Sequence, residues 1–190
     1  RNRYIALHGI ASVSFRLAVW HAICVAENIE LPDFKIPHAE KIEWMIETNG
    51  WALEPVAAVP DSDPPMPGYA YTIGLNESFS FPDIVIFGLA PVAVKGLIDL
   101  VIEQVTSGVE IPRDVPLVGL LDNELRCVFS TVDVMANAHL FTTGVKWNRG
   151  KVGAMLQLVW PDRNGWLPFE SGFDASMRLA QPAIGIAPTL

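Results

Sequence analysis

Charged residues are scarce in this 190-residue chain: they make up 18% of it, whereas 51% of its residues are hydrophobic. A share of charge below the usual quarter, together with a positive mean hydropathy, excludes an intrinsically disordered chain. The length suits one domain of ordinary size and suffices to bury a core. Because the surface is short of charge, we expect a subunit interface and therefore a homo-oligomer.

Basic residues are few as well. Lys and Arg number 13 against 21 Asp and Glu, which gives a formal net charge of −8. Phosphate binding needs clustered Lys and Arg, so this balance argues against a nucleic-acid partner. The closest group of cations is Lys146, Arg149 and Lys151. We assign that group to a solvated turn, with contact to an anion as the alternative.

Cysteine occurs only at Cys24 and Cys127, and neither belongs to a CxxC pair. This usage excludes a disulfide framework and a structural zinc site. Both residues are interpreted as buried thiols in a reducing environment, which makes the cytoplasm the expected location.

Long apolar runs are missing too. No segment reaches the roughly 18 uninterrupted apolar residues of a membrane-spanning helix. The stretch that follows Arg1 and Arg3 comes closest, but His8, Arg16 and His21 interrupt it. We therefore expect no membrane partner, and the signal-peptide pattern is incomplete.

The motifs of several enzyme classes are absent. The histidines, which show neither HxH nor HExxH spacing, are His8, His21, His38 and His139. His21 and Cys24 stand at i, i+3, which we interpret as a core thiol beside a histidine rather than as two metal ligands. The chain has no GxSxG elbow, no phosphate loop and no GxGxxG motif. We therefore expect no metal and no cofactor.

What the chain does contain is clear hydrophobic patterning. Apolar runs between turn residues predict strands at residues 51–59, 69–75, 84–89, 115–121, 125–132 and 154–160. Helical spacing predicts helices at residues 38–48 and 91–107 and an irregular one at 134–147. Residues 61–68 and 76–82 are predicted loops, and the tail from Glu170 onward is expected to wrap the surface.

This order of elements predicts an α+β fold. We expect a single twisted, mostly antiparallel sheet of about five to seven strands with about three or four helices. The strands at residues 115–121 and 125–132 are predicted to form a hairpin. One domain then spans residues 38–190.

Residues 1–37 are expected to form an N-terminal arm, separated from the domain by Pro32 and Pro37. Residues 10–30 contain neither Gly nor Pro, and their apolar side chains would cover most sides of a helix. Strand alternation from Val13 to Val19 is the alternative. An apolar helical arm favours dimerisation by packing between subunits, and packing on its own domain is the other interpretation.

Several short pieces of the chain stand in a characteristic order and spacing. They are Asn49-Gly50-Trp51, Tyr69-Ala70-Tyr71-Thr72-Ile73-Gly74-Leu75, Phe81-Pro82-Asp83, Phe87-Gly88-Leu89, Leu156-Gln157-Leu158-Val159-Trp160-Pro161-Asp162, Gly172-Phe173 and Gln181-Pro182. Over about residues 38–186 the chain thereby resembles the bacterial domain-of-unknown-function family 4262. The resemblance implies a fold unit and a bacterial or phage origin, but no mechanism. Many members begin with a short Cys-containing segment, whereas residues 1–37 here carry only Cys24.

Two carboxylates stand at the ends of predicted central strands. Asp83 precedes residues 84–89, Asp162 follows residues 154–160, and Glu77 lies in the loop before Asp83. If those strand ends meet, the two carboxylates share a cleft and one pKa rises, which suits acid–base catalysis. The alternative is that both side chains cap turns by accepting backbone N–H bonds.

Gln157 stands within an apolar strand, where its amide would be buried and would need partners. We expect those partners to be Tyr71 and Thr72 on a neighbouring strand. The set then forms either a structural network or one wall of a ligand pocket. Trp160 and Trp166 would supply the flat apolar sides of such a pocket.

The leading functional hypothesis is a non-enzymatic binding or assembly module that recognises a small molecule or a protein partner. It follows from the low charge, the apolar arm and the missing catalytic motifs. The first alternative is a metal-independent hydrolase or lyase that uses Asp83 or Asp162 with Gln157 and Tyr71. The second is an immunity-like protein that neutralises a toxin, which would fit the acidity.

Overall fold

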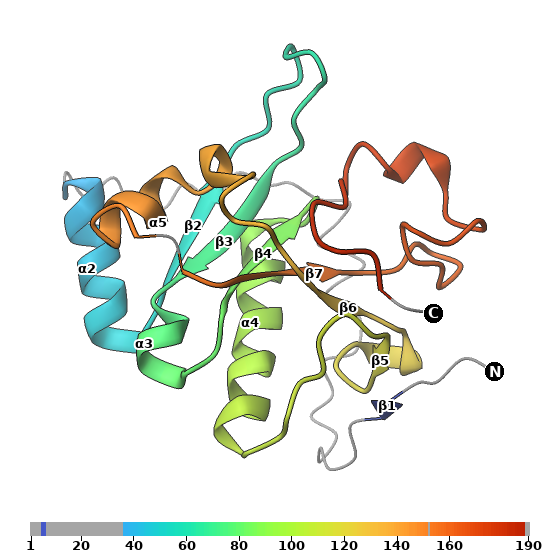
Figure 1. Cartoon of the computed structure of the whole chain (residues 1–190), viewed down its shortest axis with the longest axis horizontal. Helices are drawn as coiled ribbons and strands as arrows, with labels where there is room; N and C mark the ends of the chain where they lie inside the picture. The colour runs from blue at the N-terminus through green and yellow to red at the C-terminus, as the bar shows by residue number, and fades with distance from the viewer. Residues whose placement is uncertain (1–4, 7–35, 152, 189–190) are drawn as a thin grey trace.

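The computed structural model describes residues 5–6, 36–151 and 153–188 (Figure 1). The predicted arm helix at residues 10–30, with Cys24, lies outside the described residues. Cys127 is described, and it is a buried free thiol whose pKa burial raises to about 12. No helix in the described part of the chain has both the length and the apolar character needed to cross a membrane.

One main sheet of five strands runs through the domain. Its strands, in spatial order, are β2 (Ala52–Val56), β3 (Tyr69–Ile73), β4 (Asp83–Phe87), β7 (Met155–Val159) and β6 (Val128–Thr131). All neighbouring strands are antiparallel except β4 and β7, which are parallel. The described residues also form four α-helices. The predicted α+β fold with a mostly antiparallel sheet is therefore confirmed.

The helix α4 (Pro91–Thr106) covers one face of this sheet. Pro91 suits its first turn because proline lacks the N–H that would be unpaired there. The predicted apolar stripe is buried; its fully covered members are Val94, Leu97, Ile98 and Val101. Burying each such side chain contributes about 1.5–3 kcal/mol, so α4 is a main source of the stability of this face.

The opposite face is covered by α2 (His38–Asn49) and by the segment that leads into α5 (Thr142–Trp147). Ile42 is the buried residue of α2. The helix ends where Gly50 takes a left-handed conformation with φ 81° and donates its N–H to the carbonyl oxygen of Ile46 at 2.8 Å. Figure 1 shows α2 and α5 at one end of the molecule and the C-terminal tail at the other.

The segment predicted as a loop at residues 76–82 contains a short helix, α3 (Leu75–Phe79). Gly74 allows the chain to enter this helix sharply, because its φ of 101° is open to glycine and costly for other residues. The first N–H of the helix is satisfied by Asp83 rather than by a residue in the turn itself. A cap supplied from a later strand leaves no local sequence signal.

The predicted hairpin at residues 115–132 forms only in part. Leu117 and Cys127 make an antiparallel bridge. The first strand shortens to β5 (Leu117–Val118), and a 3₁₀ turn follows at Asp122–Glu124. The predicted irregular helix at residues 134–147 is likewise two pieces, a 3₁₀ turn at Ala138–Leu140 followed by α5.

The strand β1 (Ile5–Ala6) pairs in parallel with β5 and forms a separate two-stranded sheet. Together with Ile36 and Pro37 they are the described residues of the expected N-terminal arm, whose predicted helix at residues 10–30 lies outside the described part of the chain. The partner of β1 is the chain's own domain.

The sequence predicts that the tail from Glu170 wraps the surface, but parts of the tail are buried and pair with the sheet. Phe173 and Gln181 are buried, and Gly185 forms an antiparallel bridge with Val132 beside β6. The tail, which contains a 3₁₀ turn at Ala175–Met177, therefore packs against the part of the sheet formed by β6 and β7 (Figure 1).

Candidate functional site

Asp83, the first residue of β4, is a carboxylate with only 7% of its surface exposed. Its Oδ1 accepts the hydroxyl of Thr72 at 2.9 Å and the N–H of Leu75 at 3.1 Å. The Thr72 oxygen in turn accepts the N–H of Ile84 at 2.8 Å. Asp83 therefore ties β3, α3 and β4 together at one end of the sheet.

The acidity of Asp83 is strongly perturbed. Burial raises the pKa of its carboxyl from 3.8 to about 6, because the charged form loses its hydration. Hydrogen bonds from Leu75, Thr72 and Gly74 act in the opposite direction, and the charge of Glu77 adds to the rise in pKa. A carboxyl group of this kind can exchange a proton near neutral pH, and such groups concentrate at functional sites.

Asp83 lies beside an open hollow of about 570 Å³, which we call the Asp83 hollow. The residues that line it are Asn76, Glu77, Asp83, Trp147, Asn148, Arg149, Lys151 and Gly153. α3 supplies Asn76 and Glu77, and the segment that follows α5 supplies the amide and the two cations. The lining is mostly polar, with the indole of Trp147 as its one aromatic side.

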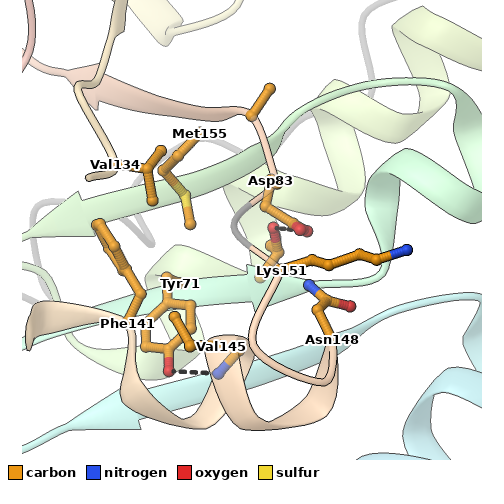
Figure 2. Close-up of a pocket in the computed structure, with 12 residues that line it drawn as sticks. Tyr71, Asp83, Val134, Phe141, Val145, Asn148, Lys151 and Met155 are labelled. Carbon is orange, nitrogen blue, oxygen red and sulfur yellow. Dashed lines mark hydrogen bonds between the residues drawn. The ribbon is translucent and has the colours of Figure 1, made fainter. Parts of the chain in front are cut away.

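A second, narrow cavity of about 20 Å³, enough for roughly one water molecule, shares Asp83, Asn148, Lys151 and Gly153 with the hollow, and we call it the inner extension. Figure 2 shows its two characters: Asp83, Asn148 and Lys151 stand at one side, and apolar side chains such as Phe141 and Met155 form the other. Polar and apolar surfaces therefore meet at Asp83.

The cationic side of the hollow is built by the end of α5. Gly150 donates its N–H to the carbonyl oxygen of Val145 at 2.8 Å, and Arg149 donates to Lys146 at 3.1 Å. Gly150 has φ 82°, and Arg149 also takes the left-handed conformation, with φ 54°. A non-glycine residue with positive φ is uncommon and costs free energy. This turn brings Arg149 and Lys151 to the rim.

Tyr71 on β3 holds α5 against the sheet. Its phenolic oxygen accepts the N–H of Gly144 at 3.2 Å (Figure 2), and its ring meets Phe141 edge to face with centroids 5.3 Å apart. Burial raises the pKa of Tyr71 above its ordinary value of 10. Gly144 lies close to this ring, since a Cβ there would be 3.3 Å from it. Tyr71 thus shapes the inner wall of the extension.

A second polar cluster surrounds Glu54 on β2, which is 7% exposed. Its Oε1 accepts the hydroxyl of Thr143 at 2.7 Å. The Nε2 atom of His38 lies 3.0 Å from Oε1 and 2.9 Å from Oε2. Sequence reasoning did not single out Glu54. Alternation along β2 could have identified Glu54, because it places Glu54 on the same buried face as Ala52.

Asp162 lies at the other end of the sheet. Because β4 and β7 are parallel, with Asp83 opposite Met155, the two aspartates are separated by the length of β7, on the order of 20 Å. The hypothesis of a shared carboxylate cleft is therefore wrong. Asp162 accepts backbone N–H groups from Asn164 at 2.8 Å, Trp166 at 3.0 Å and Asp174 at 2.9 Å. It caps the turn, as its alternative interpretation has it.

Gln157 is buried, but its partners lie in the tail instead of being Tyr71 and Thr72. Its Oε1 accepts the N–H of Ile184 at 2.9 Å and that of Gly185 at 3.1 Å, and its Nε2 donates to Pro182 at 2.7 Å. The structural network is thus the arrangement present. A tail that pairs from outside the sheet is not visible in the strand pattern itself.

The two tryptophans are held in different places. Trp160 is buried, and its indole N–H donates to the carbonyl oxygen of Phe87 at 2.9 Å. The side chain of Gln181 accepts the backbone N–H of Trp160 and donates to its carbonyl oxygen. Trp166 is 43% exposed and lines a separate hollow of about 650 Å³ together with Arg126. Of the predicted ligand residues, only Tyr71 and Thr72 therefore stand with Asp83.

The fold and the site define a small α+β domain with a polar hollow at one end of a mixed sheet. The sequence model of the family described as Domain of unknown function (DUF4262) matches residues 45–174, and the chain belongs to that family. The resemblance noted from the sequence is confirmed. No curated protein and no solved structure matches the chain. The described residues contain no group of three or more His, Cys, Asp and Glu side chains placed to hold a metal ion.

Proposed function

We propose that this chain is a ligand-binding domain and that the Asp83 hollow is its binding site. The observation that carries the proposal is the place of Asp83: a carboxyl group with 7% exposure borders a polar hollow of about 570 Å³. Ligand sites commonly measure about 300–1,000 Å³ and contain a few converging polar groups.

The energetics support a binding role for Asp83. A buried carboxylate costs stability at neutral pH, and an uncharged acceptor such as Asn would satisfy Thr72 and Leu75 without that cost. Both of these bonds end on Oδ1. The carboxyl group also accepts the N–H of Gly74, and the accepting capacity left on Oδ2, which receives neither of those two bonds, can serve a ligand.

A thermal-shift screen of a metabolite library tests this proposal. Wild type would be compared with Asp83→Asn and with Asp99→Asn, a control that alters an exposed carboxylate paired with Lys95 at 2.7 Å. Compounds that occupy the hollow should raise the Tm of wild type and of Asp99→Asn, with a smaller rise or none in Asp83→Asn. Equal shifts in all three proteins, or no shift with any compound, would contradict the proposal.

A second candidate is a metal-independent hydrolase or lyase in which Asp83 transfers a proton. Its pKa of about 6 favours this reading, since general acids and bases work best near the operating pH. Loss of such a group typically lowers the rate about 10²–10⁴-fold. Turnover of any screened substrate that survives Asp83→Asn unchanged would exclude the role, whereas binding without turnover would leave the binding domain.

We also propose that the domain is bacterial and cytoplasmic and that it associates with itself. Large apolar side chains are exposed at separate positions, among them Trp44 on α2 at 63% and Met135 in the turn after β6 at 77%, and charged residues make up only 18% of the chain. Light scattering should report a dimer, and deletion of residues 1–37 should shift it toward monomer. A monomeric wild type whose size and stability are unchanged by the deletion would refute the assembly role.

A further inference from the structure

Charges of both signs face the Asp83 hollow from different elements. Arg149 and Lys151 stand on the segment after α5, whereas Glu77 and Asp83 belong to α3 and β4. Within the described part of the chain, neither cation lies within 4.0 Å of a carboxylate oxygen. The opposite charges border one space without neutralising each other directly.

We propose that the Asp83 hollow binds a small zwitterion of the free amino acid class, a molecule with a carboxylate and an ammonium group a few atoms apart. This inference rests on the binding role proposed above. The ligand carboxylate contacts Arg149 and Lys151. Its ammonium group contacts Glu77 and the Oδ2 atom of Asp83.

The balance of charge selects for both groups together. A ligand with only a carboxylate would be attracted by Lys151 and Arg149 but repelled by Glu77 and Asp83. A ligand with only an ammonium group would meet the reverse arrangement. The side-chain amides of Asn76 and Asn148 suit either group, because an amide both donates and accepts hydrogen bonds.

The hollow has room for a ligand, whereas the inner extension does not. The hollow of about 570 Å³ has room for an amino acid, whereas the inner extension of about 20 Å³ holds no more than about one water. The extension is narrowed by Tyr71 and Phe141. A ligand side chain therefore points toward the open mouth, and the charged groups determine binding.

Binding should depend on pH through Asp83. The groups around it are Thr72 and Tyr71 from β3, Leu75 and Glu77 from α3, and Asn148 and Lys151 from the segment after α5. An ammonium group next to the carboxylate favours its ionised form, so binding releases a proton from Asp83 near pH 6. Affinity should therefore be higher at pH 8 than at pH 5.

The experiment uses matched triples of probes and isothermal titration calorimetry at pH 7.5. Each common amino acid is tested beside its deaminated carboxylic acid and its decarboxylated amine. At least one amino acid should bind about tenfold more tightly than both of its relatives, because each loses a charge-assisted hydrogen-bonded contact.

Variants assign the two ends of the ligand. Lys151→Met should weaken the amino acid and the carboxylic acid but not the amine, and Glu77→Gln should weaken the amino acid and the amine but not the acid. Both side chains are exposed, so neither change removes a buried contact. Lys41→Met, which alters an exposed lysine on α2, is the matched control and should change nothing.

The outcomes separate this inference from the binding role on which it rests. A carboxylic acid that binds as tightly as its amino acid would replace the zwitterion site with an anion site. If no amino acid binds but the library yields a ligand of another class that depends on Asp83, the zwitterion is refuted and the binding role stands. If no compound of any class binds, both fail.

Discussion

Asp83 joins β3, α3 and β4 through one oxygen while its carboxyl group borders the hollow. The first task requires an acceptor oxygen at the position of Oδ1, which an amide also supplies. The second is served by the charge, which is costly where only 7% of the residue is exposed. The two tasks can therefore be separated by replacing the carboxyl with an amide.

The stability of Asp83→Asn should depend on pH in a defined direction. The unfolded carboxyl titrates near 3.8 and the folded one near 6, so the folded protein binds the extra proton in between. Wild type consequently loses stability as the pH rises from 4 through 6. Asp83→Asn should be more stable than wild type at pH 8 by on the order of 2 kcal/mol and about equal below pH 4.

Urea unfolding at several pH values measures this difference. A variant less stable than wild type at pH 8 would mean that the fold needs the charged carboxylate. Asp99→Asn serves as the control, because the Asp99 carboxylate is exposed and pairs with Lys95 in an i, i+4 contact.

Arg149 permits a complementary test of strain against function. Its φ of 54° favours glycine, and relief of that conformation is worth about 1–2 kcal/mol, partly offset by the greater freedom of glycine in the unfolded chain. Arg149→Gly should therefore leave the Tm unchanged or raise it, while it weakens binding of carboxylate-bearing probes. A lower Tm together with unchanged binding of these probes would contradict both expectations.

Side chains at this scale were predictable where the local strand pattern carried them. Tyr71, Thr72 and Asp83 stand at or next to clear strands and were identified from the sequence. Glu54 was not, because its partners His38 and Thr143 come from distant segments. The cations Arg149 and Lys151 were visible as a group, but only the folded chain places them beside a buried carboxylate.

Among the elements, the tail depends on two glutamines for its attachment to β7. Gln157 bonds three backbone groups of residues 182–185, and Gln181 bonds the N–H and the carbonyl of Trp160. The tail also packs closely, since a Cβ at Gly88 would lie 2.6 Å from the carbonyl oxygen of Ala180.

Gln157→Leu should release this end of the tail. The substitution keeps a similar volume but leaves two N–H groups and one carbonyl without partners, which costs about 2–4 kcal/mol. Hydrogen exchange should accelerate at the amides of Ile184 and Gly185, while the amide of Trp160, held by Gln181, serves as the internal reference. Unchanged exchange at Ile184 and Gly185 would show that other contacts hold the tail.

Element type was more predictable than element direction. The strands of the main sheet and the stripe of α4 follow from hydrophobic periodicity, which is a local property. The parallel pairing of β4 and β7 depends on the path of the chain through α4, β5 and β6, and no local pattern reports it. That one direction places Asp83 and Asp162 at opposite ends of the sheet.

At the scale of the whole molecule, hydrophobic patterning reports the fold class but does not report where the polar side chains gather. The predicted fold class holds, yet its predicted site residues divide among the Asp83 hollow, the tail contacts and the hollow beside Trp166. The family of the chain brings no activity with it. The location of ligand binding is therefore the central claim to test.

The most direct measurement is a set of ¹H–¹⁵N correlation spectra of the labelled 20.8 kDa chain with the compound that gives the largest thermal shift. The proposal predicts chemical-shift changes that cluster at Asn76, Glu77 and residues 148–151 and that disappear in Asp83→Asn. Changes that cluster instead around Trp166, or that persist unchanged in Asp83→Asn, would contradict it.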